Sequence, residues 1–588
     1  MAEQRKQTIA RISEFIYEGF QKYNENFFRV TERARRRFEQ RDWGGHQQDI
    51  IERVELYEKS VRRIVVSLRK NLGPRVTDPK LWHSTRRYFG ERLYNVPDAG
   101  FMKTFFNSIT RRIFDTVGID PEIEFVSSAP DEGFNPLETL TLNRYPYWGS
   151  LDKTFKTILD DFAFKVPYRN INTDSRTISH EVQHYFQAHL KQYGDFLRFE
   201  FIDSAFFQSA RAYLIGRTIQ LDHVNPIIIA LKNSAGGIEV DAVLLSEEEV
   251  SVVFSYTRSY YFANPHSVMG AVHFLHSILP NKPIDELYTV LGRLRQGKTE
   301  RYRIFSHHLQ HTDDRFVHAD GDKGLVMLVF TLPSYDLVFK IIRDNFGYPK
   351  TINREEVQNK YRLVSRHDRA GRLIDTQEFR NLEFPVNRFD KALLDELLSE
   401  ASGTVRVHED QLIIDHVYIE RRVRPLNLYL REVERADAGE VILDYGQTIK
   451  DLANTNIFPG DLLLKNFGVT RHRRVVFYDY DEVALVTECD FRDIPDSDDD
   501  EDLMRSDVWF HVNKNDIFPE EFIKFLSMDA GLRELFLKVH GDLLTAGYWN
   551  RVKGKHLKGD IELVIPYFRH SVPADQQMEN RERKSAAM

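Results

Sequence analysis

The stretch Ile457-Phe-Pro-Gly-Asp-Leu-Leu-Leu-Lys-Asn-Phe-Gly-Val469, with Val475-Val-Phe-Tyr-Asp-Tyr-Asp481 shortly after it, carries the pattern that indicates the fold of this chain. Two short apolar runs, at residues 467–469 and 475–478, flank the polar residues 471–474, which is typical of a β-hairpin. Ahead of the stretch, an apolar stripe at helical spacing predicts a helix that ends before Pro459, formed by Ile442, Tyr445, Ile449 and Leu452. The expected order is therefore helix, polar loop, hairpin and aspartate.

Three polar side chains in this stretch have the order that phosphoryl transfer requires. Asp461-x-x-x-x-Asn466 has the spacing of a protein-kinase catalytic loop, and Asp479-Tyr480-Asp481 stands where a kinase carries Asp-Phe-Gly. A carboxylate must orient the attacking hydroxyl, and oxygen-bearing side chains must hold magnesium. We therefore predict that Asp461 is the base and that Asn466 and Asp479 are the magnesium ligands.

A lysine that neutralises phosphate is expected upstream, in an antiparallel meander that begins after about residue 310. Leu337-Val338-Phe339-Lys340 is similar to the Val-Ala-Ile-Lys strand of kinases, so Lys340 is the predicted nucleotide lysine. The turn Asp320-Gly321-Asp322-Lys323-Gly324 precedes it, and its glycines would let backbone amides approach phosphate. The Arg of a kinase His-Arg-Asp motif is missing, because Gly460 precedes Asp461, so regulation through an activation-loop phosphate is not expected.

Two other motif matches are judged by their context. Gly292-x-x-x-x-Gly297-Lys298-Thr299 matches the P-loop, but the residues before it predict a helix rather than the buried strand that a P-loop needs. His180-Glu181-Val-Gln-His184 matches the zinc-peptidase motif, but no diagnostic third ligand follows. We interpret the first as a basic helix terminus and loop and the second as a surface helix.

The composition is that of a folded protein with several domains. The 588 residues are 42% hydrophobic and 29% charged, with a net charge of −8, which gives no support for nucleic-acid binding. The single cysteine, Cys489, rules out an intramolecular disulfide and fits a reducing cytoplasm. No apolar stretch approaches the ~20 residues that span a bilayer, so no membrane association is expected.

The first half of the chain is predicted to be helical. Apolar residues recur at helical spacing between Ile9 and Tyr23 and between Ile50 and Leu68, where Gly73-Pro74 ends the second helix. Phe207, Ala210 and Leu214 continue this spacing. The predicted fold class is α+β, with an all-α N-terminal regulatory domain over residues 1–310 and a bilobal protein-kinase-like domain over 311–588. The polar tail from about residue 573 is expected to be disordered.

The chain resembles the isocitrate dehydrogenase kinase/phosphatase family in these motifs and in several longer blocks. The blocks that carry the resemblance are long and specific, and they cover nearly the whole chain; they include Gly324-Leu-Val-Met-Leu-Val-Phe-Thr-Leu-Pro333, His367-Asp-Arg-Ala-Gly-Arg372, Asp375-Thr-Gln-Glu-Phe379, Tyr418-Ile-Glu-Arg-Arg422, Asn456-Ile-Phe-Pro-Gly-Asp461 and Lys465-Asn-Phe-Gly-Val-Thr-Arg-His472.

The resemblance implies a bifunctional enzyme that uses ATP and Mg²⁺ to phosphorylate a serine of isocitrate dehydrogenase and also removes that phosphate. Flux between the citric-acid cycle and the glyoxylate bypass would be controlled in this way. Asp375 matches the aspartate required for the phosphatase reaction, and the helical N-terminal domain would bind AMP. The implied ATP-binding residues are Lys340, Lys465 and the loop Ala319-Asp320-Gly321-Asp322-Lys323-Gly324-Leu325.

The residues alone leave a small-molecule kinase of the same fold as the alternative, because such enzymes also depart from His-Arg-Asp and Asp-Phe-Gly. A P-loop ATPase using Lys298 and a zinc peptidase using His180 and His184 are more distant alternatives. A non-catalytic pseudokinase is disfavoured because the lysine, the base and both metal ligands are present. The sequence does not set the oligomeric state or the carboxylate partner of Lys340, for which Glu355 and Glu356 are nearby candidates.

Overall fold

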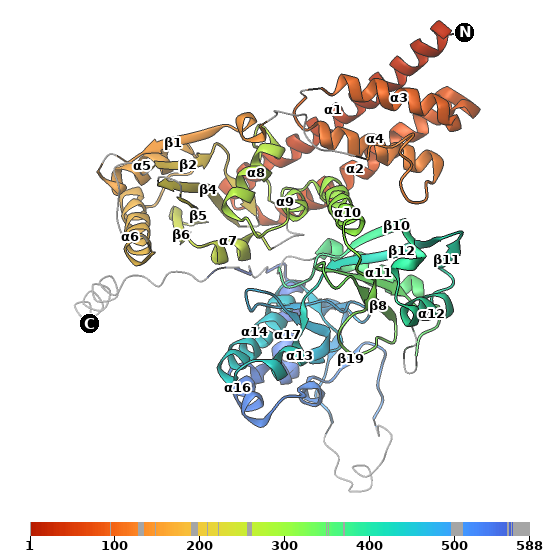
Figure 1. The fold of residues 1–588 in the computed structure, drawn as a ribbon. Helices are drawn as coiled ribbons and strands as arrows, with labels where there is room; N and C mark the ends of the chain where they lie inside the picture. The colour runs from red at the N-terminus through yellow and green to blue at the C-terminus, as the bar shows by residue number, and fades with distance from the viewer. Residues whose placement is uncertain are drawn as a thin grey trace, which may run out of the picture.

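The computed structural model shows an elongated molecule in which an N-terminal half of helices and one sheet adjoins a C-terminal half with two lobes (Figure 1). It describes residues 2–94, 96–126, 135–147, 149–189, 198–208, 210–220, 223–255, 261–347, 350, 352–367, 371–495, 510–560, 564–565 and 567. The predicted disordered tail from about residue 573 lies outside the described residues. Within these ranges, no helix combines the length and the apolar content that crossing a membrane requires.

The chain begins with a bundle of long helices, as the apolar stripes predict. These are α1 (Ala2–Gln40), α2 (Trp43–Leu72), α3 (Pro79–Arg92) and α4 (Ala99–Phe114). Residues from all four meet in one core that includes Ile16, Val61, Trp82 and Phe105. The second helix ends where Gly73 adopts a φ of 55°, a conformation that favours glycine, so the predicted stop at Gly73-Pro74 is confirmed.

The N-terminal half also contains a sheet, so the prediction that it is all-α was wrong. Six antiparallel strands run through it: β1 (Leu142–Pro146), β2 (Arg198–Ile202), β3 (Phe206–Gln208), β4 (Arg211–Gln220), β5 (His223–Ser234) and β6 (Gly237–Leu244). Alternate residues of β4 enter two different cores, Leu214 on one face and Ile215 on the other. A strand buried on both faces is apolar at nearly every position, and a helical spacing can always be found in such a run.

Helices cover both faces of this sheet (Figure 1). On one side lie α5 (Leu151–Asp161) and α6 (Ile171–His189), and on the other lie α7 (Glu247–Val253), α8 (Val268–Ile278) and α9 (Ile284–Val290). His180 and His184 are both exposed on α6, with ring centroids 6.5 Å apart, so the surface-helix interpretation is confirmed. The predicted helix before the P-loop match is α9, so the helical context that argued against a P-loop is confirmed. Lys298 and Thr299 lie inside the next helix, α10 (Leu294–Gln310), and not in a loop as predicted.

The first lobe of the C-terminal half is an antiparallel sheet with strand order β10-β12-β9-β8-β7 and β11 paired to β12. Its elements are β7 (Val317–His318), β8 (Met327–Thr331), β9 (Leu337–Ile342), α11 (Arg354–His367), β10 (Gln377–Pro385), α12 (Lys391–Glu400), β11 (Val405–His408) and β12 (Gln411–Arg421). Phe305 of α10 is buried in the core of this lobe, against Phe339. The packing therefore joins the two halves of the chain.

The second lobe is mainly helical and also carries a sheet of three short strands, β13-β15-β16, and two strand pairs, β14-β17 and β18-β19. It contains β13 (Arg424–Pro425), α13 (Leu426–Glu432), α14 (Arg435–Asn454), β14 (Ile457–Phe458), β15 (Phe467–Val469), β16 (Val475–Phe477), β17 (Ala484–Leu485), β18 (Asp490–Phe491), β19 (Asp516–Ile517), α16 (Ala530–His540) and α17 (Ala546–Leu557). The predicted helix before Pro459 and the hairpin β15–β16 are both confirmed.

A residue beyond the last helix returns to the N-terminal sheet. The Tyr567 hydroxyl donates to Asp241 Oδ2 at 2.8 Å and accepts from Arg211 Nε at 3.2 Å. Its ring packs edge-on to Tyr213 at a centroid distance of 6.4 Å. The C-terminal half therefore contacts the N-terminal half both through α10 and through Tyr567.

Candidate active site

Lys340 is held by a carboxylate on the neighbouring strand. It lies on β9, and its Nζ is 2.7 Å from Glu420 Oε2 on β12, with both residues buried. Glu420 Oε1 also accepts a hydrogen bond from Thr376 Oγ1 at 2.7 Å, and Lys340 Nζ donates to the Tyr478 carbonyl at 2.7 Å. The ammonium group is thus fixed between the first lobe and the residue that precedes Asp479.

The partner of Lys340 was not identified from the sequence. Glu355 is exposed, and Glu356 accepts from the backbone NH of Asn353 at the start of α11, so neither of the nearby candidates is the residue paired with Lys340. The available signal was Glu420 itself, an acid directly after the apolar run Val417-Tyr418-Ile419 in a strand-like stretch. An acid placed in a buried strand indicates a paired charge.

Asp461 and Asn466 lie together in the loop after β14. Asp461 Oδ1 accepts the backbone NH of Leu463 at 2.9 Å, and Asn466 Nδ2 donates to the Asp461 carbonyl at 3.5 Å. Burial raises the pKa of Asp461, and the nearby Glu482 raises it further. The Asn466 carbonyl accepts the NH of Tyr478, which connects this loop to the strand that leads to Asp479.

The half-buried Asp479 and the buried Asp481 form an acidic pair beside this loop. Burial raises the pKa of Asp479, Asp461 raises it further, and Lys340 and Lys350 oppose the shift. Burial and the Asp479 charge raise the pKa of Asp481 to about 6, and Lys350 Nζ lies 3.2 Å from its Oδ2. Clustered oxygen ligands that resist ionisation in each other's presence suit a hard divalent cation, which would relieve their mutual repulsion.

The glycine turn before β8 is anchored by ion pairs at three of its side chains. Asp320 Oδ2 lies 2.7 Å from Arg424 Nη1. Asp322 Oδ2 lies 3.9 Å from Lys465 Nζ, and Lys323 Nζ lies 2.9 Å from Glu396 Oε1 of α12. A Cβ on Gly324 would approach the Met327 carbonyl to 2.8 Å, so this position needs glycine. The Asp322–Lys465 contact connects the predicted ATP loop with the loop that carries Asp461 and Asn466.

Comparisons with known proteins agree over nearly the whole chain. The model for the kinase domain of isocitrate dehydrogenase kinase/phosphatase (AceK) matches residues 314–569, and the model for its regulatory domain matches residues 13–313. The chain belongs to this family. A protein named isocitrate dehydrogenase kinase/phosphatase from Anaeromyxobacter sp. (strain Fw109-5) is 44% identical over 558 residues, covering 94% of this chain and 96% of that protein. One of the same name from Xanthomonas campestris pv. campestris (strain 8004) is 42% identical over 576 residues, covering 96% and 97%.

Asp375, which the isocitrate dehydrogenase kinase/phosphatase family resemblance marks as the phosphatase aspartate, lies between Ile374 and Thr376 just before β10. Its Oδ2 accepts a hydrogen bond from Gln377 Nε2 at 3.0 Å and lies 3.7 Å from Nη2 of Arg301 on α10. The flanking residues reach the other site residues, because Thr376 donates to Glu420 and the Ile374 carbonyl accepts from the Tyr480 hydroxyl at 2.7 Å. Asp375 is thus placed at the boundary between this site and the N-terminal half.

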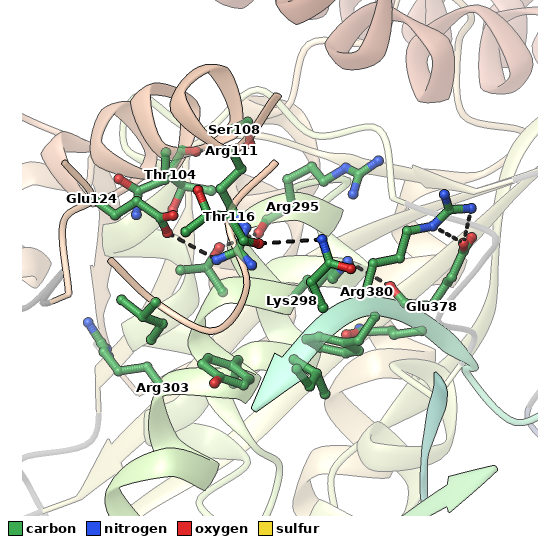
Figure 2. A pocket seen from close by; sticks show the side chains of 18 of the residues that line it. Thr104, Ser108, Arg111, Thr116, Glu124, Arg295, Lys298, Arg303, Glu378 and Arg380 are labelled. Atoms are coloured by element: carbon green, nitrogen blue, oxygen red, sulfur yellow. Dashed lines mark hydrogen bonds and ion pairs between the residues drawn. The ribbon is translucent and has the colours of Figure 1, made fainter. Parts of the chain in front are cut away.

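A cavity of about 1010 Å³ lies between the two halves, with walls from α4, α10, α11, β10 and β12. Figure 2 shows Arg111, Arg295, Lys298 and Arg303 among the side chains that line it. Arg111 is paired with Glu124, whereas Lys298 forms no ion pair within the described part of the chain and donates to the Glu378 carbonyl at 2.6 Å. Thr376 lines this cavity and donates to Glu420, so the cavity wall is one hydrogen bond from the partner of Lys340.

Replacing Glu420 tests the assignment of the lysine partner. Glu420→Gln leaves the buried Lys340 cation without its carboxylate, which we expect to lower the free energy of unfolding by about 3–5 kcal/mol. Phosphoryl transfer from ATP should also fall, because the ammonium group would no longer be held in place. Thermal unfolding and the transfer rate are the measurements. Glu356→Gln is the matched control and should behave as wild type. If Glu356→Gln lowered stability and transfer while Glu420→Gln did not, Glu356 would be the partner of Lys340 instead.

Proposed function

We propose that this chain is a bifunctional enzyme that phosphorylates a serine of isocitrate dehydrogenase with ATP and also removes that phosphate. Flux between the citric-acid cycle and the glyoxylate bypass would be controlled by the balance of the two reactions. The observation that supports this most directly is the cluster of Lys340, Asp461, Asn466 and Asp479 in a chain of this family. The family also favours a protein substrate over the small-molecule kinase alternative.

We propose that Asn466 and Asp479 hold Mg²⁺ and that Lys340 contacts the phosphates of ATP. The half-buried Asp479 and the buried Asp481 fit a divalent ion, since burial raises the pKa of both carboxyls, the Asp461 charge raises that of Asp479 further and the Asp479 charge raises that of Asp481. The ion would supply charge neutralisation at the transferred phosphoryl group. The loop Ala319-Asp320-Gly321-Asp322-Lys323-Gly324-Leu325 and Lys465 would complete the nucleotide site, with Lys323 acting through its backbone because its ammonium is engaged with Glu396.

In the kinase direction, the serine hydroxyl attacks the γ-phosphorus of ATP, the bond to the bridging oxygen breaks, and ADP leaves. Asp461 accepts the serine proton. In the phosphatase direction, water attacks the phosphoserine phosphorus and its proton passes to Asp375, while the serine oxygen leaves with a proton from Asp461. The raised pKa of Asp461 suits a group that must both accept and return a proton.

We propose that the cavity between the two halves is the site where AMP acts on the balance of the reactions. Its cationic side chains, including Arg295 and Lys298, suit a phosphate, and aromatic rings such as Tyr302 suit a base. The N-terminal half, proposed as the regulatory domain over residues 1–310, contributes α4 and α10 to its wall. The proposed location is the cytoplasm, for which the free Cys489 is suitable.

The two reactions can be separated by substitution. Asp375→Ala should lower phosphatase activity ~10²–10⁴-fold, the usual effect of losing one positioned base, and keep most kinase activity. Asp461→Ala and Asp479→Ala should impair both reactions, since one base and one metal site serve both. The measurement is the pair of rates on isocitrate dehydrogenase and on its phosphorylated form. Equal loss of both activities in a folded Asp375→Ala protein would contradict the separate role.

The nucleotide lysine is tested by comparing two lysines. Lys340→Ala should weaken ATP binding or abolish transfer, because Lys340 is the lysine held beside Asp479. Lys298→Ala should leave ATP binding at this site nearly unchanged, since Lys298 lies on α10 in the cavity wall. Titration of each variant with ATP gives the answer. Loss of ATP binding in Lys298→Ala, with the fold intact, would refute the assignment.

AMP binding should depend on pH through Lys298. Burial lowers the pKa of Lys298 to about 7, and Arg295 and Arg111 lower it in the same direction. The ammonium therefore loses its charge as pH rises through 7, while bound phosphate favours the charged form. We expect the affinity for AMP to fall by up to roughly tenfold per pH unit above pH 7. Lys298→Arg keeps its charge and should give a flat profile from pH 7 to 8.5; an equally flat wild-type profile would contradict the role of Lys298.

A further inference from the structure

Arg301 is the described cation that lies nearest to Asp375 across the boundary between the halves. Arg301 is 4% exposed, and its Nη2 lies 3.7 Å from Asp375 Oδ2. The guanidinium comes from α10, whereas Asp375 belongs to the segment before β10. A buried carboxylate and a buried guanidinium at this distance interact strongly, because little water screens them.

The guanidinium group of Arg301 is only partly satisfied. Its Nε donates to Asp285 Oδ2 of α9 at 2.7 Å, while its Nη1 is buried and has no hydrogen-bond partner among the described residues. The 3.7 Å separation from Asp375 is longer than a hydrogen bond. Burial opposes the charge of Arg301, but Asp285, Asp375 and Glu286 together raise its pKa, so it remains a cation. Asp285 thus fixes the Nε of the guanidinium group, whereas the distance between its Nη2 and Asp375 can still shorten to that of a hydrogen bond.

The other charged groups of this cluster pair among themselves. Glu286 accepts from Lys282 at 3.1 Å and from Arg421 at 3.1 Å, and the two cations lower the pKa of Glu286. Asp285 is the second acid near Arg301, and burial raises its pKa. Arg301 is therefore the cation of this cluster that faces Asp375, whereas Lys282 is a buried cation of the same cluster that faces Glu286.

Asp375 sits between two residues that contact the surroundings of the proposed nucleotide and metal sites. Thr376 donates to Glu420, the partner of Lys340, and the backbone NH of Ile374 donates to the Phe477 carbonyl at 3.1 Å. These bonds fix the backbone on both sides of Asp375. Gln377 and Arg301 both contact its side chain. Arg301 can thus affect the carboxylate without displacing Lys340 or Asp479.

We propose that Arg301 is a positioning residue for the phosphatase reaction, which orients the Asp375 carboxylate and keeps it available to accept the proton of water. This inference rests on the proposed role of Asp375 in that reaction. Arg301 acts through Asp375 and does not itself meet the substrate. The kinase reaction uses Asp461 as its base, so it does not depend on this contact.

The same helix carries residues of the AMP cavity. Lys298, Thr299 and Tyr302 of α10 line the cavity, and Arg301 leaves the same turn toward Asp375. A small shift of α10 therefore changes the distance between Arg301 and Asp375. Displacement of a catalytic group by about 1 Å can cost ~10²-fold in rate, so this contact is a sensitive place at which to alter one reaction and spare the other.

The test compares Arg301→Gln and Arg301→Lys with Lys282→Gln as the matched control. Gln removes the charge, and we expect the phosphatase kcat to fall roughly 10–100-fold while KM for phosphorylated isocitrate dehydrogenase and the kinase kcat stay within about twofold. Lys keeps the charge but cannot span Asp285 and Asp375 with a rigid fork, so it should restore part of the phosphatase rate. Lys282→Gln removes a buried cation of the same cluster, and Glu286 keeps Arg421, so the ratio of the two activities should not change.

The outcomes separate the inference from the function on which it rests. Parallel loss of both activities in Arg301→Gln, or an unchanged phosphatase kcat, would overturn the positioning role. If Arg301→Gln does not fold, the ratio of phosphatase kcat to kinase kcat in Arg301→Lys tests the positioning role. A phosphatase kcat reduced several-fold with an intact kinase kcat supports the role, and wild-type values of both refute it. Asp375→Asn is measured alongside, since full phosphatase activity in that variant would instead refute the assignment of Asp375 as the base.

Discussion

The ion pair between Lys340 and Glu420 is the interaction on which the arrangement of the site depends. A lysine in the interior of a lobe is tolerated only with a close counter-charge, and the antiparallel pairing of β9 with β12 supplies one at 2.7 Å. Because Glu420 also accepts from Thr376 and Lys340 also donates to the Tyr478 carbonyl, the pair joins three separate segments. The segment before β10, the lysine strand and the approach to Asp479 are thereby placed relative to one another.

The strand that provides Glu420 also reaches the N-terminal half. Successive residues of a strand point to opposite faces, so Glu420 faces Lys340 while Arg421 faces Glu286 of α9. Two neighbouring residues before β10 also face opposite sides, because Asp375 lies toward Arg301 and Thr376 lies toward Glu420. The strand segment therefore contacts Lys340 and the neighbouring half, and the Asp375–Thr376 segment contacts Glu420 and the neighbouring half. Together these contacts fix the boundary between the two halves.

The sequence predicted those parts of the site that are encoded by short-range spacing. Asp461, Asn466 and Asp479 lie within one helix-loop-hairpin unit, and their proximity follows from local chain geometry. Glu420 and Arg301 could not be found in this way, since their partners lie 80 and 74 residues away in sequence and the contact depends on strand pairing and on the packing of α10. The N-terminal sheet was missed for a different reason. Residues of β4 such as Leu214 and Ile215 are buried on both faces, so the alternation that identifies a half-exposed strand is absent.

Tyr567 gives the molecule a mechanical property that neither half has alone. The chain passes from the N-terminal half to the C-terminal half after α10, and the contact of Tyr567 with Asp241 and Arg211 attaches it a second time at the N-terminal sheet. These attachments act together with the Arg301–Asp375 and Glu286–Arg421 contacts along the same boundary. A rotation of the lobes away from the N-terminal half must therefore break at least one of these contacts.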